Sequence, residues 1–339
     1  MVSKRTTLAD VAVIAGVSPM TVSNVINNHP NVSRERRQRV EDAIESSGYV
    51  VNIAARGLAG GRTNTIGVFV QDLYSPHVTE IVRGVAWAAE AAGNQLLVAT
   101  TRSENLRDYL NSAESKRGFL DGICLIVPRF DGEPSDHHWQ SSLPTVLIQP
   151  QALGSGFASV RDDGYRGARM ACEHLLMLGH RRIGFVSGKE GFSNTERFQG
   201  YRDALNEAGV VYDEMLVQPG DFEQQPAFVA TQALLNLPVP PTAIFAANDP
   251  SAFGVLDAIQ ASGLHVPRDL SVVGYDDHPG SSQSHPPLTT VRQPMMQMGM
   301  IALGMLERIR AGERVVDELV LPTELIVRQS TAPVRQHHL

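Results

Sequence analysis

The first fifty residues carry the local signals of three short helices. Thr7 followed three residues later by Asp10 is a capping-box pattern, which predicts that the first helix begins there. Gly16 favours a left-handed turn that ends this helix. Ser18 followed by Pro19 is typical of the start of the next helix, because serine caps the free backbone N–H groups and proline needs none.

Apolar positions at helical spacing give each of these helices one buried face. The predicted buried residues are Leu8, Val11, Ala12 and Ala15, then Val22, Val25 and Ile26, then Val40, Ala43 and Ile44. Two helices joined by a short turn containing glycine, with a third helix over residues 33–48, predict a small all-α helix-turn-helix head. From spacing alone, a three-helix protein-interaction domain remains an alternative.

From residue 65 onward, strand-like apolar runs alternate with longer amphipathic stretches. The predicted strands are 66–70, 95–99, 122–127, 145–148, 182–186, 243–246 and 271–274, and the predicted helices between them include 76–92, 165–178 and 251–262. Alternating strands and helices predict parallel sheets with right-handed crossovers, and no internal repeat interrupts the pattern. The fold class expected for the body is therefore α/β.

Composition narrows the class of protein. The chain has 339 residues, of which 42% are hydrophobic and 19% charged, as expected for a globular protein of roughly two domains. Apolar runs such as 123–127 fall short of the ~18 residues of a membrane helix, and the first residues lack the pattern of a signal peptide. Cys124 and Cys172 are isolated, which indicates buried reduced thiols rather than disulfides or metal ligands. We expect a cytoplasmic protein that makes no contact with a membrane.

The net charge of −7 is unevenly distributed along the chain. Residues 1–62 contain eight basic and five acidic groups, a net charge of +3, and the remainder therefore carries −10. A basic head suits a polyanionic partner such as DNA, whereas the acidic body would repel it. We therefore expect DNA to dock only on the head.

Several stretches together resemble the LacI/GalR family of bacterial transcriptional repressors. The head resembles the family in TLADVAVIAGVSPMTVSNVIN (7–27), and the next segment in VSRERRQRVEDAIESSGYVVNIAARGLAGGRTNTIGV (32–68). Later matches are HLLMLGHRRIGFVSG (174–188), FAANDPSAFGVL (245–256), DLSVVGYDD (269–277) and PPLTTVRQP (286–294). This order of motifs covers nearly the whole chain.

The resemblance implies a helix-turn-helix head over residues 1–50 and a hinge helix with linker over 51–62. It also implies a two-lobed core of the periplasmic-binding-protein type over 63–332, with a tail over 333–339. One lobe would comprise about 63–161 and 292–321, and the other about 162–291 and 322–332. The family acts as dimers on pseudo-palindromic operators, with contacts expected near 76–92 and 298–310. We favour a dimer because the chain ends at Leu339 without the leucine-rich tetramerisation tail of the lactose repressor.

The family places its second helix in the major groove of DNA. By resemblance, Pro19, Met20 and Asn24 would face base edges. The candidates for phosphate contacts are Thr7, Ser18, Thr21, Ser23, Asn27 and Ser33. Most members carry Arg at the position of Asn24, and because Asn suits adenine where Arg suits guanine, we expect an unusual operator half-site unless Asn24 is merely solvated.

Residues 52–60 resemble the hinge helix that folds on operator DNA. Asn52 would contact DNA, Arg56 suits a narrow minor groove, and Leu58 holds the position of the leucine that wedges into it. Alternatively, Leu58 packs as a linker residue. Val51 stands where proline is usual and Gly57 lowers helix propensity, so we expect this hinge to melt easily.

The resemblance also implies a small-molecule effector in the cleft between the lobes, at the carboxyl ends of the strands. The candidate effector-binding residues are His77, Gln149, Asp163, Arg197, Phe222, Asn248, Asp249 and Asp276. Arg197 would bind oxygens, Asp276 would accept hydroxyl donors, and Phe222 would stack on a sugar or base. Asp163 and Asp249 are the two that we expect to be structural instead.

Three departures from the family affect the expected effector. His77 replaces a usual phenylalanine, Gln149 a frequent aspartate, and Met295 an aromatic residue. Gln149 favours a less cationic or more acidic ligand. His77 either adds a charge-assisted contact or is a neutral packing residue. A sugar or sugar acid is the first expectation and a purine or other nucleobase the second.

Three classes of function are compatible with an α/β body, and the sequence favours one. No phosphate loop, dinucleotide fingerprint, nucleophile elbow or metal-ligand spacing occurs, so we expect neither an enzyme nor a cofactor or metal. A solute-binding protein would have no use for residues 1–62. A dimeric repressor controlled allosterically by an effector explains both halves, with induction and co-repression both open.

Overall fold

The computed structural model describes residues 6–26, 29–50, 62–101, 105–130 and 139–335. These residues form two compact units, one comprising residues 1–64 with 116–121 and the other 65–115 with 122–339. Within the described ranges no single helix is long and apolar enough to cross a membrane. Helices Leu8–Ala15 and Pro19–Ile26 pass that test only as a pair bent by 103°.

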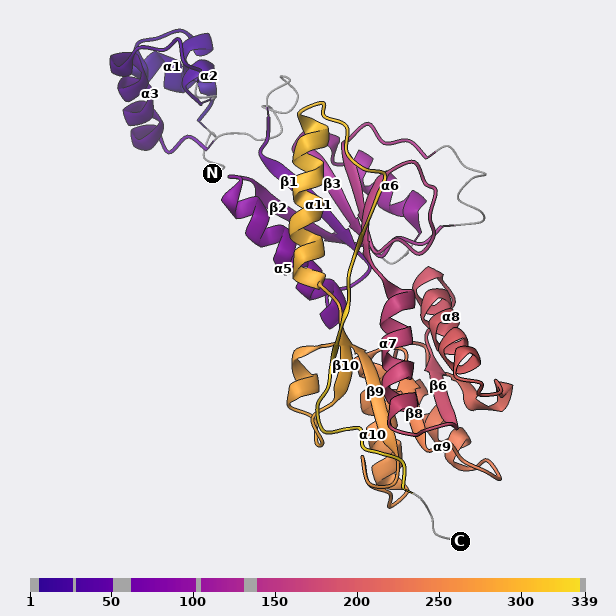
Figure 1. Ribbon diagram of the computed structural model, residues 1–339. Helices are drawn as coiled ribbons and strands as arrows, with labels where there is room; N and C mark the ends of the chain where they lie inside the picture. Colours follow the sequence, from indigo (N-terminus) through magenta and orange to yellow (C-terminus); the bar gives the residue numbers. More distant parts are fainter. Residues whose placement is uncertain (1–5, 27–28, 51–61, 102–104, 131–138, 336–339) are drawn as a thin grey trace. The chain divides into compact units, whose positions relative to one another are not determined.

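The first unit contains three helices, α1 (Leu8–Ala15), α2 (Pro19–Ile26) and α3 (Arg34–Ser47) (Figure 1). The predicted capping box is present, since the Thr7 hydroxyl accepts from the Asp10 N–H and the Asp10 carboxylate accepts from the Thr7 N–H. Gly16 lies in the left-handed region at φ 64° and ends α1. Seven buried residues form the core of the unit: Val11, Ala12, Ala15, Val22, Val25, Val40 and Ala43.

The end of the first unit is fixed by one carboxylate. Asp121, which follows the short helix η1 (Arg117–Phe119), accepts from the Thr63 N–H at 2.9 Å, the Thr63 hydroxyl at 2.8 Å and the Asn64 N–H at 2.9 Å. These bonds hold the chain at the point where residues 51–61 end and strand β1 begins. The predicted hinge residues of this segment lie outside the described residues.

The second unit contains two six-stranded sheets. The first has the order β11-β5-β4-β3-β1-β2, and all its neighbouring strands pair in parallel. Its strands are β1 (Thr65–Val70), β2 (Gln95–Thr100), β3 (Gly122–Ile126), β4 (Thr145–Ile148), β5 (Ala158–Asp162) and β11 (Glu318–Leu321). The helices of this half are α5 (Pro76–Ala91), α6 (Leu106–Glu114) and α11 (Met295–Arg310).

The second sheet has the order β12-β10-β9-β8-β6-β7, and only the β10–β12 pair is antiparallel. Its strands are β6 (Ile183–Ser187), β7 (Val217–Pro219), β8 (Ala243–Ala246), β9 (Ser271–Asp276), β10 (Thr289–Arg292) and β12 (Glu324–Ile326). Its helices are α7 (Gly164–Met177), α8 (Phe192–Glu207), α9 (Gln224–Leu235) and α10 (Asp249–Ala261), with short turns η3 (Glu214–Leu216) and η4 (Pro279–Ser282). The chain thus passes between the sheets after β5, after β10 and after β11.

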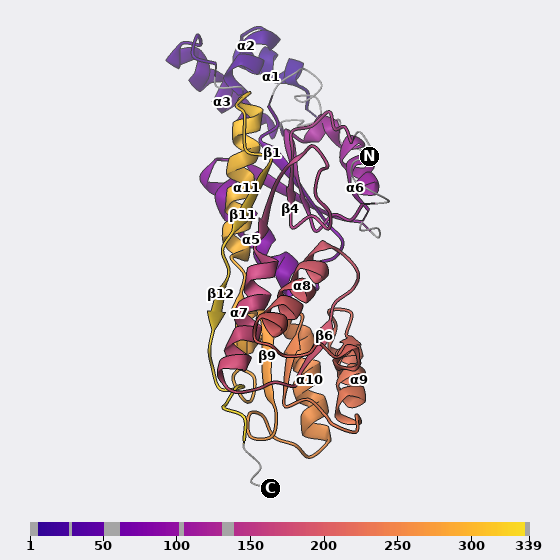
Figure 2. The ribbon, with the colours of Figure 1, turned by 45° about the vertical axis from the view of Figure 1, so that its right-hand side comes forward.

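Helices pack in pairs on these sheets. Figures 1 and 2 show α5 beside α11 and α7 beside α8. The α5–α11 contact is close because two glycines face backbone. A Cβ on Gly84 would overlap the Met296 carbonyl, and one on Gly299 would overlap the Ile81 carbonyl. The predicted class, a small helical head with a two-lobed α/β core, is confirmed.

Candidate functional site

A cavity of about 1070 Å³ lies at the strand ends of the second unit and draws its walls from both sheets. Gln149 follows β4 of the first sheet, whereas Arg197 of α8 and Asp276 at the end of β9 belong to the second. Parallel strands bring their carboxyl ends to the same edge, and loops and helix starts there supply the polar groups. Six of the eight expected effector residues line the cavity: His77, Gln149, Arg197, Phe222, Asn248 and Asp276.

Arg197 is the central charged group of the cavity. It is 4% exposed, donates from Nη1 to the Ala247 carbonyl at 2.7 Å, and lies 3.9 Å above the Tyr275 ring centroid. Among the described residues its buried Nε has no hydrogen-bond partner. Burial alone would lower the pKa of Arg197, but Tyr275, Asp162 and Asp276 raise it above its usual value, so the guanidinium stays charged.

Asp276 lines the same cavity and is buried. Burial raises the pKa of this carboxyl well above its usual range, and the nearby Arg197 opposes that rise only in part. The Gln293 amide donates to Asp276 Oδ1 at 2.6 Å. The Asp276 oxygens can accept hydrogen bonds from ligand hydroxyls in the cavity.

A hydrogen-bonded chain connects the two sheets behind the cavity. The Tyr275 hydroxyl of β9 donates to Asp162 Oδ2 of β5 at 2.6 Å, and burial raises the pKa of Tyr275 well above 10, so the phenol keeps its proton. Asp162 also accepts from Gln149 Nε2 at 2.7 Å, and Gln149 Nε2 lies 3.2 Å from Gln293 Oε1. Gln149 is therefore already hydrogen-bonded between the sheets, which the sequence did not indicate.

His77, at the start of α5, is neutral at pH 7. Burial, reinforced by the positive charge of Arg197, lowers its pKa from 6.5 to about 4. Of the two roles considered for His77, the charge-assisted contact is therefore disfavoured. The ring can still donate or accept one hydrogen bond in its neutral form.

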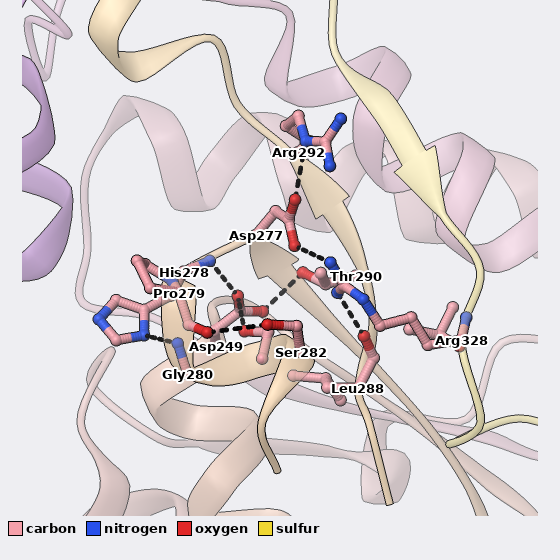
Figure 3. Close-up of polar contacts among 12 residues, drawn as sticks. Asp249, Asp277, His278, Pro279, Gly280, Ser282, Leu288, Thr290, Arg292 and Arg328 are labelled. Carbon is pink, nitrogen blue, oxygen red and sulfur yellow. Dashed lines mark hydrogen bonds and ion pairs between the residues drawn. The ribbon is translucent and has the colours of Figure 1, made fainter.

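Asp163 and Asp249 do not line the cavity. Asp163 caps α7, accepting from the Arg166 N–H at 2.9 Å. Asp249 is fully buried and accepts from the His278 N–H at 2.8 Å, the Ser281 hydroxyl and the Thr290 hydroxyl at 2.6 Å (Figure 3). Both carboxylates are therefore occupied by bonds that hold the loops around β9 and α7.

An ion-pair group missed by the sequence reasoning lies at the lip of the cavity. Asp277 is bonded by Arg292 at 2.7 Å and by Arg328 at 2.5 Å, and Arg328 also donates to the Leu288 carbonyl (Figure 3). Arg292 in turn reaches Glu324 of β12 at 3.3 Å. Arg292 ends β10 and Glu324 begins β12, where the chain passes between the two sheets. The ion pairs of Asp277, Arg292 and Glu324 therefore connect two of these crossing segments.

The head presents the expected DNA-contact residues on α2 and at the helix starts. Met20 is 70% exposed and Pro19 is exposed, whereas Thr21, Ser23 and Asn24 are half-buried. The hydroxyls of Thr7, Ser18 and Ser33 cap their helices. Asn27, Asn52, Arg56 and Leu58 lie outside the described residues.

Arg37 of α3 was not singled out from the sequence. Its guanidinium donates to the Val25 carbonyl at 3.5 Å and to the His29 carbonyl at 3.1 Å, beside the C-terminal end of α2. A cation there satisfies free carbonyls and complements the helix dipole. Its spacing of twelve residues from Val25 gives no local signal that would reveal this contact.

A helix-turn-helix head joined to a two-lobed α/β core with a polar cavity is typical of a ligand-responsive transcriptional regulator, and comparisons with known proteins agree. Residues 7–52 match the model of bacterial regulatory proteins of the lacI family, and residues 172–331 match the periplasmic binding protein-like domain. The transcriptional regulator CelR of Thermobifida fusca is 38% identical, over 96% of this chain and 98% of its own. The chain belongs to the LacI family of bacterial transcriptional regulators, and its relatives are regulators rather than enzymes.

Two solved structures are similar over nearly the whole chain. The lac repressor dimer bound to operator and the anti-inducer ONPF has a TM-score of 0.85 and 30% identity, covering 97% of this chain and all of that one. The CelR–cellobiose complex has a TM-score of 0.69 and 34% identity, covering 96% of this chain and all of that one. One relative is thus seen with operator DNA and the other with a sugar.

Proposed function

We propose that the protein is a sequence-specific repressor that binds a pseudo-palindromic operator as a homodimer in the cytoplasm, under the allosteric control of a sugar or sugar-acid effector. The observation that carries this proposal is the cavity at Arg197 and Asp276, in a chain that also has a helix-turn-helix head. The domain limits predicted from the sequence are part of the proposal: a head over 1–50, a hinge over 51–62 and a core over 63–332.

The polar groups of the cavity favour a ligand rich in hydroxyls. Arg197 offers an unsatisfied Nε–H donor, and the Asp276 carboxyl offers oxygen acceptors to ligand hydroxyls. The Asn248 side-chain oxygen accepts from the Ser251 N–H and caps α10, and its amide nitrogen donates to the Phe222 carbonyl, so Asn248 orients the loop beside the ligand. The cellobiose seen with CelR makes a β-linked disaccharide the first compound to test.

A nucleobase remains the second candidate. Phe222 lines the cavity and its ring centroid lies 5.6 Å from the Arg197 guanidinium carbon, so a flat ligand could stack there. Asp163 and Asp249 are proposed as structural. His77 and Gln149 are proposed to contact the effector as neutral groups.

We propose that the DNA contacts of the family are made by the residues at the matching positions of this chain. Pro19, Met20 and Asn24 are proposed to face base edges, with phosphate contacts from Thr7, Ser18, Thr21, Ser23, Asn27 and Ser33. Asn52, Arg56 and Leu58 would contact the minor groove when two hinges pack together. The exposure of Met20 supports this orientation of α2.

A second copy is proposed to pack on the side of the first lobe that carries α5 and α11, near residues 76–92 and 298–310. Trp87 of α5 is 56% exposed, which leaves a large apolar ring on this side of the lobe for such a contact. Sedimentation of the purified protein at micromolar concentration would test this.

Two measurements test the proposed function together. A thermal-shift screen over sugars, sugar acids, sugar phosphates and nucleobases identifies the effector, because a ligand at ~100 times its Kd adds ~2.7 kcal/mol of stability. A gel-shift assay with the operator selected from random DNA then asks whether that ligand changes DNA affinity. Loss of affinity indicates an inducer, a gain indicates a co-repressor, and the absence of any selected DNA sequence would refute the proposal.

A further inference from the structure

We propose that Gly188 is a positioning residue of the effector site: because it has no side chain, the Phe222 ring lies over it, and the cavity accepts a larger ligand than it otherwise would. The inference deepens the proposed function and rests on it, since the cavity must be the effector site. It concerns a residue that lies behind the site rather than one that contacts the ligand.

The contact between Gly188 and Phe222 leaves no room for even one carbon atom. Gly188 directly follows β6, is buried, and donates from its N–H to Asn194 Oδ1 at 2.7 Å. A Cβ built on Gly188 would overlap the Cε1, Cε2 and Cζ atoms of the Phe222 ring. The ring therefore lies directly against the backbone of residue 188.

The backbone of Gly188 does not itself require glycine. Its φ lies outside the left-handed region in which other glycines of this chain are found, such as Gly191 at 148°. An alanine could therefore adopt the same backbone conformation. The three atoms nearest to a Cβ at this position all belong to the Phe222 ring, so the requirement for glycine comes from the neighbouring ring.

The backbone conformation of residues 221–222 also fixes the position of the Phe222 ring. Asp221 and Phe222 both have positive φ, 56° and 63°, which is uncommon for residues other than glycine and strained for a bulky one. Such a conformation persists only where the surroundings maintain it. Here the Asn248 amide donates to the Phe222 carbonyl at 3.0 Å.

The cavity is open space next to the ring. Phe222 packs on one side against the core of the second lobe, which includes Phe185 and Tyr201, and on the other it lines the cavity near Arg197. A side chain at position 188 would therefore displace the ring toward Arg197. The displaced ring would occupy volume that the ligand needs, and a longer ligand would lose more than a short one.

Crystal structures of the ligand-free protein test the placement directly. We expect the Gly188→Ala variant to show the Phe222 ring moved into the cavity, and the Gly188→Ala/Phe222→Ala double variant to show an unaltered backbone with an open cavity. If the ring stays over residue 188 in the single variant and the cavity keeps its volume, the inference is wrong. If the single variant does not fold, folding of the double variant supports the contact and its failure refutes it.

Calorimetric titration with cellobiose and glucose tests the consequence for ligand size. An extra methyl group in a packed protein core typically costs an amount equivalent to about tenfold in an equilibrium constant. On that scale Gly188→Ala should raise the Kd for cellobiose by about tenfold and the Kd for glucose less. In a protein that already carries Phe222→Ala, adding Gly188→Ala should change the Kd for cellobiose by less than about twofold. Equal losses for both sugars, or an undiminished effect without the ring, would overturn the inference.

Gly118→Ala serves as the matched control. Gly118 lies in η1, outside the cavity lining, and a Cβ there would meet nothing within 4 Å. This variant should bind sugars as the wild type does. If neither sugar binds the wild type, cellobiose and glucose are not effectors of this protein. The ligand-free crystal structures then still decide whether Gly188 positions the Phe222 ring.

Discussion

The hydrogen bond between Tyr275 and Asp162 joins the two sheets, and the Tyr275→Phe variant isolates it. The substitution removes one hydroxyl and keeps the ring, including its stacking under the Arg197 guanidinium. The bond is 2.6 Å long, and Asp162, its acceptor, is only 3% exposed. Water cannot readily replace the lost donor at such a site.

The magnitude follows from the charge and burial of the acceptor. Hydrogen bonds to charged groups contribute about 1.5–3 kcal/mol, and a buried acceptor left without its donor costs a similar amount. Asp162 retains the Gln149 amide, which limits the loss. We therefore expect the free energy of unfolding to fall by about 2 kcal/mol, and the melting temperature by roughly 4–8 °C for a domain of this size.

Tyr201→Phe is the matched control for this measurement. Tyr201 is equally buried, but its hydroxyl donates at 2.8 Å to the neutral Ile183 carbonyl within one lobe. Urea unfolding should show a loss of about 1 kcal/mol for this variant. If Tyr275→Phe unfolds within about 0.5 kcal/mol of the wild type, the bond between the sheets is not stabilising and the reasoning fails. Equal losses for both tyrosines would remove any special role for the acceptor charge.

Three further predictions concern the site and the hinge. Arg197→Ala should abolish the effector response in a gel-shift assay while operator affinity without effector stays nearly unchanged, and a wild-type response would mean that the cavity is not the effector site. Because burial lowers the pKa of His77 from 6.5 to about 4, the unfolded chain binds a proton first as pH falls. The contribution of neutral His77 to the free energy of unfolding is therefore fully present above pH 6.5 and is lost as the pH falls from 6.5 to about 4. Urea unfolding of His77→Asn across that pH range should not show this loss of stability. Leu58→Ala should weaken operator binding and abolish DNA bending with effector binding intact, and unchanged bending in a permuted-site gel assay would contradict the assignment of the wedge.

Local signals explain why the helical head and the alternating core could be predicted. The Thr7–Asp10 capping box and the left-handed Gly16 involve residues only a few positions apart, so a short stretch of sequence is enough to predict them. The strands of the core are continuous apolar runs because both faces of a parallel sheet are covered. Boundaries differ by a residue or two, as for α10, which begins at Asp249 rather than Ser251.

The cavity was only partly predictable from the sequence. The ends of the strands indicate which residues lie near it, but not which side chains point into it. Asp249 and Asn248 are adjacent in sequence, yet Asn248 lines the cavity and Asp249 accepts three hydrogen bonds beneath it. Tyr275 reads as one more apolar residue of a buried strand, and its partner Asp162 lies 113 residues away. Gly188 gives no signal at all, because its role depends on where a distant ring comes to rest.

The close contact between α5 and α11 has a mechanical consequence. Both helices begin at the cavity, where His77 and Met295 line it, and both extend sixteen residues, or about 24 Å. At Gly84 and Gly299 each helix touches the backbone of the other, so neither can slide or rotate alone without a collision. A displacement of one helix at the cavity therefore carries the other helix with it.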